Sequence, residues 1–431
     1  MAALLLTSMV WSGHAQEKNE MDLSGEWAFQ TDVMDFRRGS LDVRYCHRLQ
    51  ESIVLPGITD DYKIGYKSPY RHLDRLTRVY EYMGPAWYQR EIEIPAAWKG
   101  KRIFLYFERT HWLSSVYVGK EEVSKIDYIS IPHNHELTQW LHPGKKELIT
   151  FCIDNRYQYD THKWDHAHSE FTQINWNGVL GEIKLVAVDP VYVDDMQVYP
   201  DIKNKSIKVK MTVRNCTEHT ASGKISFHVT GKDYRLQKEV PVTVTDSITY
   251  IEEEMFLGKD IHLWNEFHPN LYTLDCKLTS SVEGQSYAHE KSTTFGMREV
   301  EAGEDHIILN GEPIHLRGTV ENAVFPKTGY APVDDASWER VLRILKEYGM
   351  NHMRFHSWCP PAAAFRMADK LGVYLEVEMP MWGKDAQPDE KRWNFFRREL
   401  RGILKEYGNH PSFILYCNGN EITGDFRFIE E

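Results

Sequence analysis

The sequence predicts a multidomain fold in which two β-rich regions precede an α/β region. Two observations support this prediction. Short alternating strands separated by turn residues recur from about residue 22 to about residue 300, whereas strands and helices alternate from residue 307 onward. The first pattern is typical of β-sandwiches, and the second is that of the first half of a (β/α)8 barrel. The length of 431 residues fits about two to four domains, and an apolar fraction of 42% is ample for real cores.

The first β-rich region is predicted from five runs between residues 22 and 190. They are Gly25–Phe29, Trp87–Ile92, Arg102–Phe107, Ser115–Val118 and Leu148–Ile153. Turn residues lie between them, as expected for an all-β sandwich. A second β-rich region follows from residue 191 to about residue 300. Its clearest strand is Ile207–Val213, which alternates apolar and polar residues throughout.

The α/β region is predicted from strands that alternate with capped helices. The expected parallel strands are Ile314–Gly318, Asn351–His356, Val373–Glu378 and Phe413–Cys417. An Asn310-Gly311 pair predicts a hairpin turn just before them. Helix start signals are Asp334 or Asp335, Pro360 and Asp389, and helix stop signals are Gly349 and Gly408. The apolar stripes expected to face the core comprise Trp338, Val341, Leu342, Leu345 and Tyr348 in the first helix and Trp393, Phe396, Leu400, Leu404 and Tyr407 in the third.

The composition narrows the range of partners. The 51 Lys and Arg against 63 Asp and Glu give a net charge of −12, so a nucleic-acid backbone is a poor partner. Beyond the N-terminus, no stretch approaches the ~18 apolar residues of a membrane-spanning helix, and we expect no span. The 13 Trp suit sugar rings, although core filling in the sandwiches explains most of them.

Residues 1–15 have the features of a secretory signal peptide. An apolar run from Ala2 to Val10 is followed by small residues that end at Ala15, although the basic start of such a signal is missing. We expect cleavage near Ala15 and a periplasmic or secreted location. A buried N-terminal segment is the alternative.

The six cysteines show no paired spacing such as Cys-x-x-Cys, which argues against a zinc or thioredoxin-like site. We expect free and mostly buried thiols, no metal and no cofactor. A bridge between Cys216 and Cys276 is the alternative in an oxidising compartment.

Polar residues gather near the carboxyl ends of the predicted parallel strands. Period-two alternation puts one set on one side of each strand: His352, Arg354 and His356 on the second strand, and Tyr374, Glu376 and Glu378 on the third. Charged side chains rarely line a sheet unpaired. They form either a structural ion-pair network or a polar substrate site at the barrel mouth.

The fourth strand carries the most specific motif. Asn409-His410-Pro411-Ser412 precedes it, and Asn418-Gly419-Asn420-Glu421 follows at the carboxyl end, where parallel barrels keep their chemistry. By composition alone, Glu421 would be a solvated loop carboxylate. The surrounding residues favour a catalytic role, because the whole motif resembles the acid/base motif of retaining glycosidases. It is closest to glycoside hydrolase family 2, which includes β-galactosidases, β-glucuronidases and β-mannosidases.

This resemblance implies a role for individual residues. Glu421 would be the general acid/base and Asn420 would hold the sugar 2-hydroxyl. Arg354 matches an arginine that orients the nucleophile, Glu378 matches the acidic residue that ends the third strand, and His356 is a further candidate for substrate binding. The chain departs from the family at Arg354–Pro360, where many members have Arg-x-Ser-His-Tyr-Pro, and at Glu321-Asn322, where His-Glu is usual.

The resemblance also implies the domain types. Residues 22–190 would form a jelly-roll sugar-binding domain, residues 191–300 an immunoglobulin-like domain, and residues 301–431 a partial catalytic (β/α)8 barrel. The polar stretch Trp164–Gly181 is too long for a tight turn and is a candidate functional loop. Asn175, Trp176 and Asn177 could reach the sugar from it, and packing of the loop against the barrel is the alternative.

We therefore predict a retaining β-glycosidase that cleaves a β-galactoside-type glycan by double displacement. The substrate would be an oligosaccharide or polysaccharide, and the chain could assemble as a homo-oligomer. The alternatives are a β-glucuronidase or β-mannosidase of the same family and a non-catalytic carbohydrate-binding protein. The family places its nucleophile on a later strand, so we expect a C-terminally truncated chain that is inactive by itself.

Overall fold

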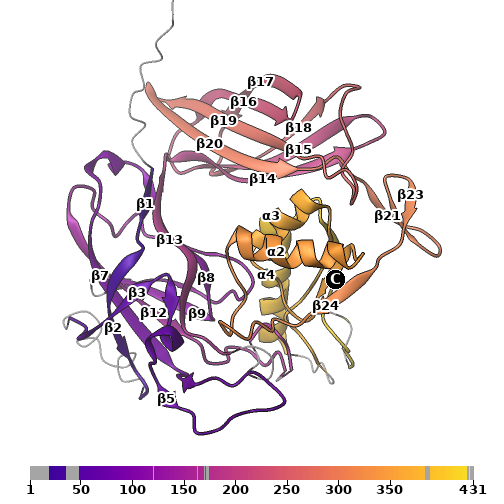
Figure 1. The fold of residues 1–431 in the computed structure, drawn as a ribbon. Coiled ribbons are helices and arrows are strands. Elements are labelled where there is room, and N and C mark those ends of the chain that lie inside the picture. Colours follow the sequence, from indigo (N-terminus) through magenta and orange to yellow (C-terminus); the bar gives the residue numbers. More distant parts are fainter. Residues whose placement is uncertain are drawn as a thin grey trace, which may run out of the picture.

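The computed structural model describes residues 19–34, 48–119, 121–162, 164–168, 170, 174–383, 389–424 and 427. The predicted signal peptide at residues 1–15 lies outside this part. The described chain is mostly β-sheet and forms three parts in sequence order (Figure 1). Among the described residues, none of the helices is long and apolar enough to cross a membrane.

The first part is a sandwich of two antiparallel sheets. One sheet holds β1 (Glu20–Asp22), β13 (Gly178–Val188), β8 (Arg102–Thr110) and β11 (His133–Glu136) in this order, with β4 (Gly57–Ile58) paired to β13. The other holds β10 (Glu121–Ile126), β9 (Leu113–Val118), β12 (Lys146–Asp154), β7 (Pro85–Glu93), β2 (Gly25–Thr31) and β3 (Glu51–Leu55). All five predicted strands are confirmed. Aromatic side chains such as Tyr88 and Phe151, which stack with ring centroids 4.9 Å apart, fill the space between the sheets.

A small hairpin of β5 (Tyr66–Lys67) and β6 (Tyr80–Glu81) projects from the first sandwich (Figure 1). The second sandwich packs β14 (Val191–Asp201), β15 (Ser206–Asn215) and β18 (Ile248–Phe256) against β17 (Tyr234–Val244), β16 (Ala221–Gly231), β19 (Tyr272–Val282) and β20 (Gln285–Phe295). Cys216 is exposed and Cys276 is buried, and both thiols are free, so the alternative of a bridge between them is not realised.

The third part begins with a small antiparallel sheet of β21 (Val300–Ala302), β22 (Ile307–Leu309) and β23 (Glu312–Ile314). Asn310 and Gly311 both have positive φ at the turn between β22 and β23, as their sequence predicted. The predicted first parallel strand, Ile314–Gly318, is wrong. Ile314 pairs with Ile307 in the antiparallel hairpin, and the parallel sheet starts only at Gly318.

The parallel sheet has the order β24 (Gly318–Glu321), β25 (His352–Phe355), β26 (Tyr374–Glu378) and β27 (Phe413–Cys417). The helices α2 (Asp335–Glu347), α3 (Ala362–Leu371) and α4 (Glu390–Tyr407) connect these strands. We call residues 318–424 the α/β unit. Its four strands form an open sheet, and no closed barrel is present in the described part of the chain.

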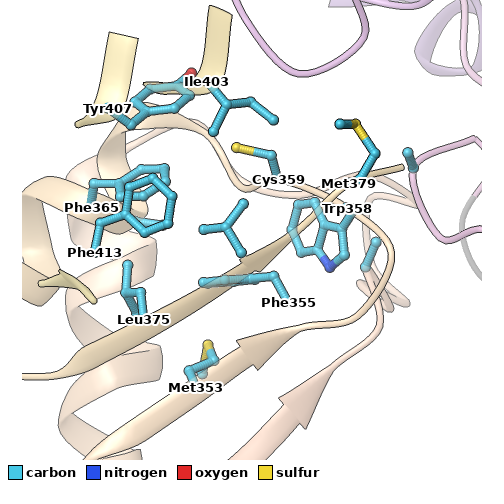
Figure 2. Packing of buried hydrophobic residues seen from close by; sticks show 14 of the residues in the cluster. Met353, Phe355, Trp358, Cys359, Phe365, Leu375, Met379, Ile403, Tyr407 and Phe413 are labelled. Carbon is cyan, nitrogen blue, oxygen red and sulfur yellow. The ribbon is translucent and has the colours of Figure 1, made fainter. Parts of the chain in front are cut away.

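Local capping explains where the helices of the α/β unit begin. Asp334 accepts a hydrogen bond from Ser337 N at 2.8 Å, and Asp389 accepts one from Lys391 N at 3.0 Å, as predicted. The core between strands and helices contains Met353, Phe355, Leu375 and Phe413 from the strands and Phe365 and Tyr407 from the helices (Figure 2). Two residues of the predicted stripes are not part of it: Tyr348 is 77% exposed and Leu404 is 45% exposed. Both residues lie at the edge of the apolar face that was predicted for their helix.

The residues before β27 connect this strand to its neighbours. Asn409 accepts a hydrogen bond from Val198 N in the second sandwich at 2.8 Å and donates to Met196 O at 2.9 Å. His410 lies 2.5 Å from an oxygen of the buried Asp369, and Asp369 also accepts from Ser412 N at 3.0 Å. The Asn-His-Pro-Ser segment therefore fixes the position from which β27 enters the sheet.

Candidate active site

Arg354 connects three strands at the carboxyl end of the parallel sheet. Its guanidinium forms an ion pair with Glu378 at the end of β26 and lies 3.5 Å from Glu376 Oε1. It also donates from Nη2 to Asn420 Oδ1 at 3.1 Å, just beyond β27. The predicted alternation is confirmed here, because Met353 and Leu375 face the helices while Arg354 and Glu376 face the opposite side.

Glu378 is wholly buried, and both of its carboxylate oxygens are engaged. Oε1 accepts from Arg354, and Oε2 accepts from Ser357 N at 2.7 Å. Ser357 adopts a φ of +57°, which a non-glycine residue rarely takes. Its hydroxyl lies 2.9 Å from Nδ1 of His356. Arg354 is thus bonded to both Glu378 and Asn420, and Ser357 links His356 to Glu378. Both interpretations of this polar set require such contacts.

Glu376 and His352 extend the network toward the amino ends of the strands. His352 Nε2 lies 3.5 Å from Glu376 Oε2. Burial, with Arg354 nearby, lowers the pKa of His352 to about 4, and burial raises the pKa of Glu376. The imidazole is therefore neutral at pH 7, and Arg354 is the cation that these carboxylates share.

Glu421 follows Asn420 and is exposed. Its Oε2 accepts a hydrogen bond from Nε1 of Trp382 at 3.1 Å. The backbone of this turn is held by Asn420 N, which donates to Met381 O at 2.9 Å, and Glu421 has a φ of +46°. Strained backbone of this kind gathers at functional sites, because only the surrounding structure maintains it.

Aromatic rings surround Trp382. The ring of His356 lies 4.8 Å and that of His166 lies 5.5 Å from it, measured between centroids, and Trp164 lies at 6.2 Å. Burial, with His356 beside it, lowers the pKa of His166 to about 3, and burial also lowers the pKa of His356. Trp164 and His166 belong to the stretch Trp164–Gly181, which the sequence predicted as a candidate functional loop without a role for these two residues, and Trp382 was not predicted as a site residue. A usable signal was present for Trp382, which closely follows the carboxyl end of a predicted strand.

Glu321 ends β24 and completes this edge of the sheet. Its carboxylate accepts from Ala323 N at 2.9 Å and Val324 N at 3.2 Å, and its backbone oxygen accepts from Trp358 Nε1 at 3.0 Å. Burial raises the pKa of Glu321 to about 7 despite these bonds. Glu321 therefore shapes the turn that follows β24.

Asn175 and Trp176 do not join this cluster. Asn175 is wholly buried and Trp176 is 5% exposed, so neither side chain is open to a sugar. Trp176 packs against His111 and Tyr330 between the first sandwich and the α/β unit. Asn177 is also buried, and its amide accepts from Tyr88 Oη at 2.9 Å. The alternative, in which this stretch packs against the third part of the chain, fits Trp176, which contacts Tyr330, whereas Asn177 is bonded inside the first sandwich.

Within the described part of the chain, no group of three or more His, Cys, Asp or Glu side chains is arranged to hold a metal ion. The groups present at this edge are an exposed carboxylate, a fixed amide and a shared guanidinium. That set can bind hydroxyl groups and transfer a proton.

Comparisons with known proteins find glycoside hydrolases. The sequence profile "Glycosyl hydrolases family 2" matches residues 191–298, and this match, with the relatives below, establishes the resemblance to that family. A β-galactosidase of Thermoanaerobacter pseudethanolicus is 23% identical over 355 residues, covering 81% of this chain and 47% of that enzyme. A β-glucuronidase of Sus scrofa is 21% identical, covering 97% of this chain and 66% of that enzyme.

Solved structures support the fold. Bacteroides uniformis β-glucuronidase 2, covalently bound to cyclophellitol-6-carboxylate aziridine, matches with a TM-score of 0.73 and 19% identity, covering 93% of this chain and 47% of that one. A family 2 glycosyl hydrolase of Bacteroides cellulosilyticus matches with a TM-score of 0.75 and 20% identity, covering 94% of this chain and 52% of that one. The chain spans about half the length of several curated relatives that it matches.

Proposed function

We propose that this chain carries the acid/base side of a retaining β-glycosidase site that cleaves a β-galactoside-type glycan by double displacement. One observation carries the proposal. A single guanidinium, Arg354, connects Glu378 and Asn420 at the carboxyl ends of parallel strands, and the exposed Glu421 follows directly. Parallel α/β sheets bind and transform ligands at this edge.

Glu421 protonates the leaving glycosidic oxygen and later removes a proton from water. The indole N–H of Trp382 can only donate, so the oxygen that it binds, Oε2, is an acceptor in either protonation state. We assign the transferable proton of Glu421 to Oε1, the oxygen that Trp382 does not bind.

Asn420 binds the sugar 2-hydroxyl. Arg354 can only donate hydrogen bonds, so it fixes which end of the Asn420 amide is the oxygen. The amide NH2 then points away from Arg354, and no acceptor for it is found among the described residues. Arg354 and Glu378 thus position Asn420. His356 lines the proposed substrate site at the same edge of the sheet.

Double displacement needs a second carboxylate about 5 to 5.5 Å from the acid/base. Glu378 is buried with both oxygens bonded, which leaves it unsuited to attack an anomeric carbon. We place the nucleophile outside the described residues, on a later strand of a (β/α)8 barrel whose first half would be the α/β unit. The two sandwiches would be the jelly-roll and immunoglobulin-like domains of the family. The 431-residue polypeptide alone would then be inactive, and the complete protein would be periplasmic or secreted.

A β-glucuronide is the second candidate substrate. The observation that favours it is the number of β-glucuronidases among the relatives and solved structures that match, including the pig enzyme and the B. uniformis enzyme. A panel of aryl β-galactosides, β-glucuronides and β-mannosides, assayed with the complete gene product and with the 431-residue chain, separates these sugars. Glycan binding without turnover by the complete gene product would favour a non-catalytic carbohydrate-binding protein.

The decisive test of the mechanism is Glu421→Gln in the complete gene product. General acid catalysis supplies about 10² to 10⁴ in rate, so turnover of substrates with poor leaving groups should fall by that order. Substrates with activated aryl leaving groups need less protonation and should lose less in the glycosylation step. An equal loss on both kinds of substrate, or no loss, would remove Glu421 from the acid/base role.

A further inference from the structure

Four aromatic side chains from two distant parts of the chain meet beside Glu421. His356 and Trp382 follow strands of the α/β unit, whereas Trp164 and His166 belong to the segment that connects β12 to β13 in the first sandwich. The rings of His166 and His356 lie 4.7 Å apart, and both lie within 5.5 Å of Trp382, measured between centroids. Figure 1 shows the first sandwich, in indigo and purple, beside the α/β unit in orange and yellow.

The segment that carries Trp164 is held by a buried carboxylate. Asp165 is wholly buried and accepts from Thr161 Oγ1 at 2.6 Å, from Ala167 N at 3.1 Å and from His168 N at 3.3 Å. Nδ1 of the equally buried His168 lies 2.8 Å from the same carboxylate. These bonds satisfy the carboxylate oxygens of Asp165 and hold the backbone on either side of Trp164 in one conformation.

The same segment is docked on the α/β unit. The backbone N–H of Trp382 is directed at Thr161 O at 3.4 Å, and Arg392 donates to Asp160 O at 3.2 Å. Tyr159 stacks on Phe395 of α4 with centroids 4.4 Å apart. The first sandwich is therefore fixed against the edge of the sheet that carries Glu421.

Trp164 stands at the outer end of this aromatic cluster. Its ring lies 6.2 Å from that of Trp382, which donates to the Glu421 carboxylate, yet 39% of Trp164 remains exposed. A general acid that protonates a glycosidic oxygen lies on the leaving-group side of the bond. The exposed indole of Trp164 adjoins the Trp382 ring that binds this acid, and aromatic faces with one wet side suit sugar rings.

We propose that Trp164 forms a leaving-group subsite, in which its indole stacks on the sugar ring released from a β-glycoside. The first sandwich then takes part directly in substrate selection, through a segment that Asp165 holds in place. This inference rests on the proposed function, because it assigns the leaving-group side from the role of Glu421.

The test compares two substrates with the sugar that the aryl-glycoside panel identifies. One is a disaccharide, whose leaving group is a sugar ring, and the other is the β-glycosyl fluoride, whose leaving group is a single atom. For Trp164→Ala in the complete gene product, we expect the ratio of kcat/KM for the disaccharide to kcat/KM for the fluoride to fall about three- to tenfold. Trp164→Phe should keep most of the ratio, since a smaller aromatic face remains.

Trp140→Ala is the matched control, because Trp140 lies in the same sandwich, is 36% exposed and has no contact with the cluster in the described structure. It should leave the ratio unchanged. An unchanged ratio for Trp164→Ala would overturn the subsite, and if both kcat/KM values fell equally the role of Trp164 would be merely structural. Failure of the proposed function would give a different result. Wild-type protein without turnover on any aryl glycoside would refute both proposals together.

Discussion

The second sandwich and the α/β unit both contain ion pairs between a basic and an acidic side chain, but the pairs differ in how far they are exposed to solvent. On the sandwich, Lys224–Glu239 and Lys277–Glu290 connect neighbouring strands at 2.9 Å and 2.7 Å, with every side chain more than half exposed. In the α/β unit, Arg354 is 31% exposed and its partner Glu378 is wholly buried. Exposed pairs contribute about 0 to 1 kcal/mol, whereas a buried pair is expensive to form and more expensive to break.

This difference indicates what the buried network does. A protein gains little stability by burying Arg354 and Glu378 instead of an apolar pair, so the network is better explained by the geometry that it imposes on Asn420. The surface pairs impose no such geometry on a site. This contrast predicts a graded series of effects on stability, largest at Arg354 and smallest at Lys224.

Arg354→Ala should have the largest effect on stability, because it leaves the Glu378 carboxylate buried without its cation. Breaking such a pair costs about 3 to 5 kcal/mol, and the partial exposure of Arg354 favours the lower end. Hydrogen exchange of the β25, β26 and β27 amides would measure the loss locally. The double variant Arg354→Ala/Glu378→Gln should recover part of it. Absence of recovery would mean that the two side chains are not coupled.

Glu399 on α4 is a buried carboxylate that forms no ion pair within the described part of the chain. It accepts from Ile129 N at 2.7 Å, and burial raises its pKa from 4.5 to about 7. Between those two values of pH, the native state keeps a proton that the unfolded state has lost. Stability therefore falls as pH rises from 4.5 to 7, by about 3 kcal/mol for this one group.

Glu399→Gln should remove that contribution. Urea unfolding at pH 5 and pH 7 should show a smaller loss of stability for the variant than for the wild type. Glu321, whose pKa is also about 7, adds a slope of the same sign to both proteins and cancels in the difference. Glu347→Gln, at an exposed position on α2, is the control and should keep the wild-type slope. Equal slopes for wild type and Glu399→Gln would contradict the prediction.

Asn409→Ala should cost about 2 kcal/mol, because it removes three hydrogen bonds between the segment before β27 and the second sandwich. Faster proteolysis or hydrogen exchange at the contact of β14 with this segment would measure the effect. Asn204→Ala, at an exposed turn of the second sandwich, controls for loss of an amide. A change no larger than that of the control would mean that the segment is held by packing alone.

Lys224→Ala should have the smallest effect, a change in stability close to the error of the measurement, because its partner Glu239 stays hydrated after the substitution. Urea unfolding in low and high salt would check this, and the small difference from wild type should vanish at high salt. A loss comparable to that of Arg354→Ala would erase the contrast between the two regions.

Local signals in the sequence predicted much of the fold. Alternation predicted β2, β7, β8, β9, β12 and β15, and side-chain caps at Asp334 and Asp389 predicted where two helices begin. These features depend on residues a few positions apart, so the sequence displays them directly. The placement of Arg354, Glu376 and Glu378 on one side of the sheet follows from the same two-residue period.

Only the tertiary structure decided which side chains share the edge around Glu421. Trp164 and His166 reach it from the first sandwich, more than 200 positions away in the sequence, whereas Asn175 and Trp176 from the same polar stretch are buried. The antiparallel pairing of Ile314 with Ile307 likewise moved the start of the parallel sheet to Gly318. The sequence alone determined which chemical groups follow strand β27, namely the amide of Asn420 and the carboxylate of Glu421. Contacts between residues far apart in the chain decided what surrounds that chemistry, because packing and hydrogen bonding across parts leave no periodic trace in the sequence.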